Sequence, residues 1–319
     1  MMRAISYRFA GSSSVPDVAY AEVPKPEVNA GDVLVRVHFA GLSNFEKETS
    51  EGKRKGSLTR AMQKKSVVSG IEMAGVVERG CGTFSPGDKV VGYTNIFRGP
   101  FLHSDYVAIP PSKLALIPDN ISLQGAASIV GGALTSITAL ERIAGITADQ
   151  KLLVTGATGS VGITAVQLAS HLGAQVSGVC HSSQTDFVSE QGAIAAFAYD
   201  KDELPAQNGQ FHLVFDTAPS LGFASASGYL TPQGTFISTM PQLDITGFLR
   251  SVFSRKKWGY LMESDTDQAR MSRLQDLMKA GAFCEVIDSI YPLPKASDAF
   301  AHQLERGKRG KILIDFSDQ

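Results

Sequence analysis

The sequence has few cysteines and no excess of charge, and both shortages exclude classes of protein. Its three cysteines, Cys81, Cys180 and Cys284, are too few and too far apart for a disulfide framework. They form no cluster with the histidines that has metal-ligand spacing. A net charge of -1 and a pI of about 6.6 give no electrostatic footprint for nucleic acid. We therefore expect a protein of the reducing cytoplasm that has no nucleic-acid partner.

Long apolar runs are missing as well. The first residues, MMRAISYRFAG, lack the apolar region of a secretory signal. The longest nearly uncharged stretch, Gly125–Leu140, is shorter than a membrane span and contains serine, threonine and glycine. We expect it to form a buried helix, and we expect no membrane partner. The basic cluster Gly52–Lys65 is interpreted as solvated loop surface, with anion binding as the lesser alternative.

The texture of the sequence changes near residue 122. Before it, short alternating segments such as Gly31–Leu42 and Met73–Gly80 are bounded by glycine or proline, which is typical of a β-rich domain. After it, uninterrupted apolar strands alternate with helices, which indicates a parallel sheet covered on both faces. Thr266–Gly281 has helical periodicity, with Thr266 as the expected N-cap. The C-terminal tail adds a helix and a strand that we expect to return to the first domain.

The segment Lys151–Gly162, KLLVTGATGSVG, joins a predicted buried strand to a predicted helix through three spaced glycines. The spacing G-x-x-G-x-x-G is a variant of the dinucleotide fingerprint, in which glycines let the backbone approach a pyrophosphate at a helix N-terminus. A strand-to-helix turn without a ligand is the alternative. The predicted cofactor-binding residues of this turn are Gly156, Ala157, Thr158, Gly159, Ser160, Val161 and Gly162.

The second strand of the fingerprint ordinarily ends in an acid that holds the ribose 2′-hydroxyl. Here it ends in VCHSSQ, with no acid until Asp186, so nothing in this stretch repels a 2′-phosphate. His181, Ser182 and Ser183 are candidate donors to that phosphate, although no arginine or lysine accompanies them. The pattern favours NADPH and leaves NADH open.

Two dehydrogenase superfamilies share such a turn. TGATGSVG resembles the N-terminal motif of short-chain dehydrogenases, but it lies in the middle of this chain. The Tyr-x-x-x-Lys pair of that family must sit one helical turn apart. The match here is Tyr291–Lys295, YPLPK, whose two prolines forbid a helix. The short-chain interpretation is therefore rejected.

Motifs along nearly the whole chain resemble the medium-chain dehydrogenase/reductases, specifically the zinc-free quinone oxidoreductase (zeta-crystallin-like) branch. They include PEVNAGDVLVRVHFAGLSNFEKE, SGIEMAGVVERGCGTFSPGDKVVGY and YPLPKASDAFAHQLERGKRGKILI. The resemblance implies an α/β protein, in which a doubly wound Rossmann sheet is inserted into a GroES-like β-rich catalytic domain. We expect boundaries at 1–123, 124–262 and 263–319, and a homodimer formed by the edge strand near Trp258–Met262.

The resemblance also implies hydride transfer without zinc. The metal-dependent branch has Gly-His-Glu where this chain has GIE, and Ile71 cannot ligate a metal. A small-molecule acceptor such as a quinone or another α,β-unsaturated carbonyl suits a site without a Lewis acid. An NADH-linked carbonyl or alcohol dehydrogenase, or a non-catalytic NADPH-binding redox sensor or structural protein, remains as an alternative.

Individual site residues follow from the family motifs and from the strand ends. The resemblance places Asn44 and Thr135 near the nicotinamide, as candidate catalytic residues, and Tyr199 and Lys311 beside the cofactor. Thr217, Ala218, Ser238 and Thr239 follow the fourth and fifth strands of the sheet, where doubly wound sheets bind ligands. Tyr93 and His103 are candidates for the substrate pocket. For each, ordinary packing or turn formation is the alternative.

Overall fold

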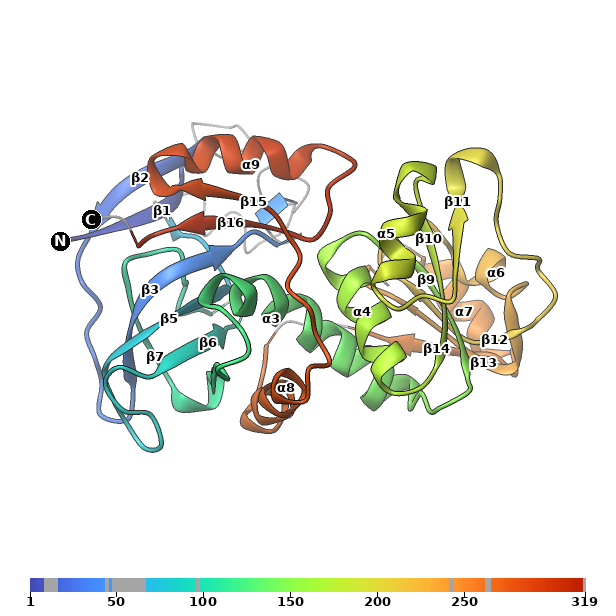
Figure 1. The fold of residues 1–319 in the computed structure, drawn as a ribbon, viewed down its shortest axis with the longest axis horizontal. Coiled ribbons are helices and arrows are strands. Elements are labelled where there is room, and N and C mark those ends of the chain that lie inside the picture. The colour runs from blue at the N-terminus through green and yellow to red at the C-terminus, as the bar shows by residue number, and fades with distance from the viewer. Residues whose placement is uncertain are drawn as a thin grey trace.

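The protein consists of two lobes that lie side by side, and both ends of the chain belong to the β-rich lobe (Figure 1). The structure is a computed structural model that describes residues 1–8, 17–43, 46–47, 67–95, 98–240, 244–261 and 265–317. Asn44 and the basic cluster 52–65 lie outside the described residues.

The β-rich lobe contains two sheets. One has the order β15-β16-β3-β5-β6-β8, with β7 pairing with β3, and the other has the order β2-β1-β4. Alternation explains the central strand, because Val33, Val35 and Val37 are buried while the residues between them are half-buried. The strands are β1 (Met2–Arg8), β2 (Asp17–Val23), β3 (Val33–Gly41), β4 (Val67–Val68), β5 (Glu72–Arg79), β6 (Lys89–Tyr93), β7 (Tyr106–Ile109), β8 (Leu114–Leu116), β15 (Ile287–Pro292) and β16 (Lys311–Asp315).

The C-terminal strands complete this sheet. β16 runs antiparallel to β3, and β15 runs parallel to β16. The chain therefore leaves the β-rich lobe after β8, forms the second lobe and comes back.

The second lobe is a six-stranded parallel sheet with the order β11-β10-β9-β12-β13-β14. Its strands are β9 (Lys151–Thr155), β10 (Gln175–Cys180), β11 (Ala195–Ala198), β12 (Phe211–Asp216), β13 (Leu230–Ser238) and β14 (Lys257–Tyr260). Apolar residues of β9 face opposite sides, since Leu152 packs in one core cluster and Leu153 in another. The Rossmann sheet inserted into a β-rich domain is thereby confirmed.

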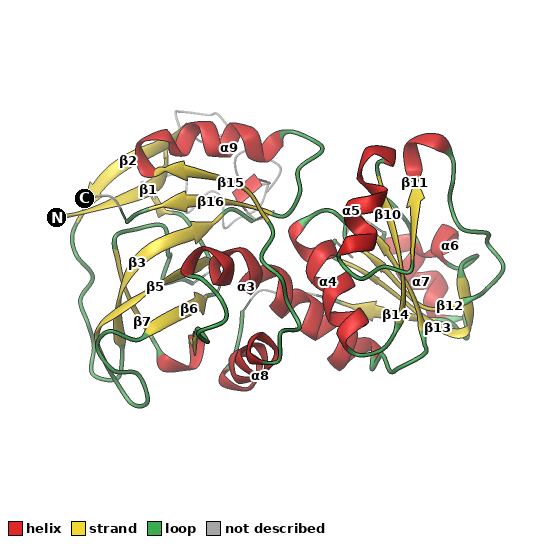
Figure 2. Ribbon diagram, viewed as in Figure 1, coloured by secondary structure: helices red, strands yellow, loops and turns green. Residues whose placement is uncertain are grey.

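Helices cover both faces of the parallel sheet (Figure 2). One face carries α4 (Ser160–His171) and α5 (Thr185–Glu190), and the other carries α6 (Phe223–Ala226) and α7 (Ile245–Val252). The sequence analysis assigned no helix to the stretch that forms α7. In the β-rich lobe, α9 (Ala296–Leu304) packs on β2, β15 and β16.

Helix α3 (Leu123–Ile137) joins the lobes. Its N-cap Ser122 accepts a hydrogen bond from Gly125 N, and the helix packs on β3, β5 and β6 as well as on α4 and α8. Together with the turns that follow it, Leu123–Ala144 is long and apolar enough to cross a membrane, but 72% of its apolar window is buried in the protein. The predicted buried helix is therefore confirmed.

Helix α8 (Gln268–Lys279) packs against α3 and β8. Its N-cap is Asp267, whose carboxylate accepts from Arg270 N, rather than the predicted Thr266. Gly281 follows the helix in the left-handed region, with a φ of 71°. Short turns of 3-10 helix at Pro111–Lys113, Ser182–Gln184, Tyr199–Lys201 and Leu293–Lys295, and a π-helical segment at Thr138–Ala144, complete the regular structure.

Candidate active site

Close contacts leave no room for a side chain at two of the three glycines in the turn between β9 and α4. Gly156 has a φ of 63°, and a Cβ there would lie 2.7 Å from the Ala218 Cβ. A Cβ on Gly162 would lie 2.1 Å from the Gly156 carbonyl oxygen, so the first turn of α4 packs directly on the loop. Both glycines are therefore required by the protein itself.

Gly159 differs from the other two glycines. A Cβ there would meet one protein atom, the Gly156 carbonyl oxygen, at 3.5 Å. The residue is the N-cap of α4, and none of the described side chains caps the helix in its place. Space and free amide groups therefore remain at the positive end of the helix.

Ser160 adds a donor at the same end of α4. Its Oγ is buried and has no hydrogen-bond partner among the described residues. The first turn of α4 contains no acidic residue. An anion such as a pyrophosphate would satisfy both the hydroxyl and the amides, so these residues fit the phosphates of a dinucleotide.

A buried carboxylate supports the turn from the neighbouring strand. Asp216, at the end of β12, accepts a hydrogen bond from Thr155 Oγ1 at 2.5 Å and others from Ser220 and Leu221. The Thr217 hydroxyl donates to the Thr155 carbonyl at 2.6 Å. Thr217 was predicted to bind the cofactor, but its hydroxyl holds the glycine turn in place. The sequence analysis missed Asp216, because an acid at a strand end is not distinctive.

The carboxyl end of β10 gathers the predicted 2′-phosphate residues, but it also brings in an acid. Ser182 N and Oγ both donate to the Asp200 carboxylate at 2.7 Å, and His181 Nε2 lies 3.5 Å from it. The Ser182 hydrogen bonds keep the pKa of Asp200 below its ordinary value. Tyr199 packs edge-on against the His181 ring. The second strand, β10, is not followed directly by an acid. Asp200, which follows the third strand β11, places a carboxylate at the same position.

Arg309 supplies the cation that was missing near β10. Its guanidinium lies over the Phe187 ring and donates to the Ser183 carbonyl at 3.4 Å. Gln184 Nε2 donates to the Gly307 carbonyl at 2.8 Å, and Gly310 N donates to the Thr158 carbonyl at 2.9 Å. The loop between α9 and β16 thus reaches across to the Rossmann lobe (Figure 1). Sequence spacing carried no signal for this contact, which joins residues more than 120 positions apart.

A buried ion pair lies where the lobes meet. Lys311 Nζ and Glu72 Oε1 are 2.5 Å apart, and their side chains are 4% and 0% exposed. Glu72 Oε2 also accepts from Gly131 N at 3.0 Å. The prediction that Lys311 contacts the cofactor is corrected accordingly, because its ammonium group is buried on Glu72.

Glu46 is a second buried carboxyl in this region. Its Oε2 accepts from Ser43 N at 2.9 Å and from the Ser43 hydroxyl, while Oε1 is buried without a described partner. Burial raises the pKa of Glu46 above its ordinary value. Burial therefore favours the neutral form of this side chain.

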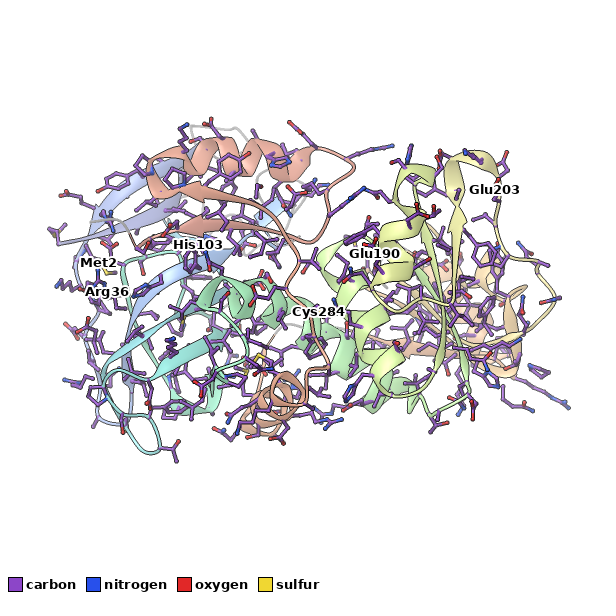
Figure 3. The ribbon with its side chains drawn as sticks, in the orientation of Figure 1. Met2, Arg36, His103, Glu190, Glu203 and Cys284 are labelled. Carbon is purple, nitrogen blue, oxygen red and sulfur yellow. The ribbon has the colours of Figure 1, made fainter. Side chains whose placement is uncertain are left out.

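His103 does not line an open pocket, which corrects its assignment as a substrate residue. The ring lies inside the β-rich lobe (Figure 3) and is 0% exposed. Its Nδ1 is 2.8 Å from Ser69 Oγ, and its Nε2 is 3.1 Å from the Gly41 carbonyl. Tyr93 is 4% exposed and pairs in register with Glu72.

The remaining candidates are placed as follows. Thr135 is half-buried on α3, and its Oγ1 donates to the Gly131 carbonyl at 2.8 Å. Ser238 and Thr239 lie at the end of β13, where Ser238 lines a pocket of about 280 Å³ beside Trp258. Among the described residues, no group of three or more histidine, cysteine or acidic side chains is arranged to hold a metal ion.

The fold and the open N-terminus of α4 fit a dinucleotide-binding protein, and comparisons with known proteins indicate an oxidoreductase. The zinc-binding dehydrogenase family model matches residues 184–314. A chloroplastic quinone oxidoreductase, QR1, of Triphysaria versicolor is 27% identical over 99% of this chain and 98% of its own. The mitochondrial NAD(P)H oxidoreductase RTN4IP1 of Bos taurus is 25% identical over 97% of this chain and 85% of its own.

The fold agrees with a solved structure. The quinone oxidoreductase from Coxiella burnetii superposes with a TM-score of 0.84 at 21% identity, covering 98% of this chain and 99% of its own. These similarities support the medium-chain dehydrogenase/reductase superfamily, in its quinone oxidoreductase-like branch.

Gly159→Ala tests whether phosphate occupies the open space at α4. The added methyl group has only one protein neighbour, so we expect an unchanged melting temperature and a Kd for NADPH raised by about tenfold or more. Ser160→Ala should also weaken binding, because it removes the free hydroxyl. Isothermal titration and thermal unfolding measure the two effects. Unchanged affinity in both variants would contradict the assignment.

His103 should make stability depend on pH. Burial lowers its pKa from 6.5 to about 4, so below pH 6.5 the unfolded chain binds a proton that the folded chain does not. The free energy of unfolding should fall by roughly 2 kcal/mol from this residue between about pH 7 and about pH 5. Urea unfolding at both pH values should show a smaller fall for His103→Gln. Equal falls in the two proteins would refute this.

Proposed function

We propose that this protein reduces quinones or other α,β-unsaturated carbonyl compounds with NADPH and without zinc. One observation carries the proposal: the open N-terminus of α4, with a Ser160 hydroxyl that has no partner among the described residues, lies beside the point where Gly310 of the β-rich lobe joins the glycine turn. A dinucleotide bound there is in contact with the lobe that holds the substrate in this family.

The reaction suits the groups that the chain provides. Reduced nicotinamide, when bound, supplies a hydride. A conjugated acceptor spreads the resulting negative charge over an enolate or quinol oxygen, so the protein needs to orient the acceptor. Water can complete the protonation of that oxygen, so no particular side chain has to supply the proton.

The residues do not fit a catalytic zinc ion. Ile71 stands where the metal-dependent branch has a ligand histidine, and its side chain is packed in the core. The adjoining Glu72 is occupied by Lys311 and by Gly131 N. A catalytic zinc site needs three protein ligands, which these positions do not supply. We therefore derive no step through a metal.

The preference for NADPH rests on a balance of charges beside β10. Arg309, His181 and Ser183 offer donors to a 2′-phosphate, and the guanidinium is a strong phosphate ligand. Asp200 opposes them, because its carboxylate repels a phosphate and engages both Ser182 donors. We propose that these donors make NADPH bind more tightly than NADH, and that Asp200 reduces this difference in affinity.

Turnover separates the proposal from its alternatives. We expect NADPH absorbance to fall when the protein is mixed with a panel of quinones and enones. Tight NADPH binding without turnover would instead favour a redox sensor. Zinc at stoichiometric content with oxidation of primary alcohols would favour the dehydrogenase.

Cofactor preference can be shifted in both directions. Arg309→Ala should raise the Kd of NADPH by about tenfold and leave NADH nearly unchanged, whereas Asp200→Asn should tighten NADPH by a few-fold. Arg306→Ala, an exposed arginine in the same loop, is the matched control. Fluorescence titration with both cofactors measures these values. An equal loss in the Arg306 and Arg309 variants would show general attraction rather than a specific contact.

A further inference from the structure

The loop between α9 and β16 brings a cation of the β-rich lobe to the Rossmann lobe. Arg309 is exposed and lies over the Phe187 ring of α5, whereas Lys308 is half-buried and its Nζ donates to the Glu305 carbonyl within the loop. In Figure 1 the loop runs along the side of the β-rich lobe that faces α5. Arg309 is therefore the cation that this loop carries to the predicted 2′-phosphate site.

The backbone of Arg309 is held by a carboxylate of its own lobe. Asp288, on β15, accepts a hydrogen bond from Arg309 N through Oδ1 at 2.9 Å. Arg309 lies in no helix or strand, and glycines stand at positions 307 and 310, so the local backbone has few restraints of its own. The hydrogen bond to Asp288 thus fixes the point from which the guanidinium reaches out.

The other carboxylate oxygen of Asp288 faces His302 of α9. His302 Nε2 lies 3.5 Å from Asp288 Oδ2, and the two side chains are 24% and 15% exposed. On the opposite edge of the ring, Nδ1 lies 3.0 Å from the Tyr291 hydroxyl and 3.2 Å from Ser289 Oγ. Because a hydroxyl can donate to Nδ1, Nε2 can carry the proton that faces Asp288. The carboxylate is therefore oriented by partners on both of its oxygens.

Asp288 has two opposite effects on a phosphate that Arg309 binds. Its negative charge repels the phosphate, so the charge alone would weaken NADPH binding. Its hydrogen bond would strengthen NADPH binding, because the backbone of Arg309 is already ordered before the phosphate arrives. Removal of Asp288 therefore tightens NADPH if the charge is what matters, and weakens NADPH if the hydrogen bond is what matters.

We propose that Asp288 is a positioning residue for cofactor selectivity, which holds Arg309 N so that the guanidinium meets the 2′-phosphate of NADPH. His302, in turn, orients Asp288. This inference rests on the proposed preference for NADPH, and it adds the residues of the β-rich lobe on which that preference depends. Both side chains act through Arg309, so they change the affinity for NADPH and leave the hydride-transfer step as it is.

Two substitutions at position 288 separate the hydrogen bond from the charge. Asp288→Ala removes both, whereas Asp288→Asn removes the charge and keeps an oxygen that can accept from Arg309 N. We expect Asp288→Ala to raise the Kd of NADPH by about fivefold, the effect of one ordinary hydrogen bond, and Asp288→Asn to stay within about twofold of the wild type. Fluorescence titration at constant ionic strength measures both. NADH, which has no 2′-phosphate, should bind equally well to all three proteins.

A double-mutant cycle shows whether Asp288 acts through Arg309. In the Arg309→Ala protein, Asp288→Ala should cause no further loss of NADPH affinity, because the guanidinium that it positions is gone. His302→Ala should raise the Kd of NADPH by about twofold alone and have no effect once Asp288 is replaced by alanine.

Steady-state kinetics and a matched control complete the experiment. In every variant kcat at saturating NADPH should equal that of the wild type, while KM for NADPH should follow the Kd. Asp298→Ala, which removes an exposed acid of α9, is the control and should change neither value. Unchanged binding of NADH shows that each variant is folded.

Each contrary result has its own meaning. Equal tightening of NADPH by Asp288→Ala and Asp288→Asn would show that Asp288 acts only as a charge. Additive losses in the cycle, or a parallel loss of NADH affinity, would show a general structural role. Loss of NADPH affinity in Arg309→Ala but not in Asp288→Ala would overturn this inference alone. Unchanged NADPH affinity in Arg309→Ala would overturn the proposed phosphate contact and this inference with it.

Discussion

The structure depends on a charge pair that is almost completely buried. Lys311 and Glu72 are 239 positions apart in the chain, yet they bring β16 and β5 together, and the same carboxylate accepts from Gly131 of α3. Removal of one partner of such a pair leaves an uncompensated buried charge, which costs about 3–5 kcal/mol. The pair also explains why residues 41 and 131 are glycines, because a Cβ at either would lie within 2.9 Å of the Glu72 carboxyl group. The pair thus fixes how the returning chain, the β-rich sheet and the helix between the lobes meet.

The cofactor site extends this arrangement by hydrogen bonds of side chains and backbone. Asp216 and Thr217 hold the glycine turn from one side, and the Gly310 amide joins it from the other lobe. Most polar groups here are used within the protein, so the few that are not, such as the Ser160 hydroxyl, indicate where a ligand belongs. Function in this fold resides in those unpaired groups, since the architecture itself serves many reactions.

Sequence patterns predicted what depends on neighbours in the chain. The strand alternation of β3, the buried α3, the six parallel strands and the strand–glycine–helix turn all come from local periodicity and spacing. Such local patterns could not predict contacts between distant segments. Tertiary packing determines the contacts of Asp200 with Ser182 and of Arg309 with Ser183, and the burial of Lys311 on Glu72. His103 was misjudged for the same reason, because a sequence does not reveal that both ring nitrogens have partners. Helix α7 was missed, although its apolar spacing is regular.

The loop that carries Arg309 relates ligand binding to the relative position of the two lobes. Gly307 and Gly310 take φ values of 87° and 83°, which only glycine adopts readily, so the loop has a defined shape as it crosses to the Rossmann lobe. A dinucleotide held by both lobes would be a thermodynamic link between them, because part of its binding energy goes into setting their relative position. Reciprocity then requires that any substrate that favours the same position also tightens the dinucleotide. If the dinucleotide is held by both lobes in this way, its binding and that of the substrate would be coupled even if the two ligands never touch.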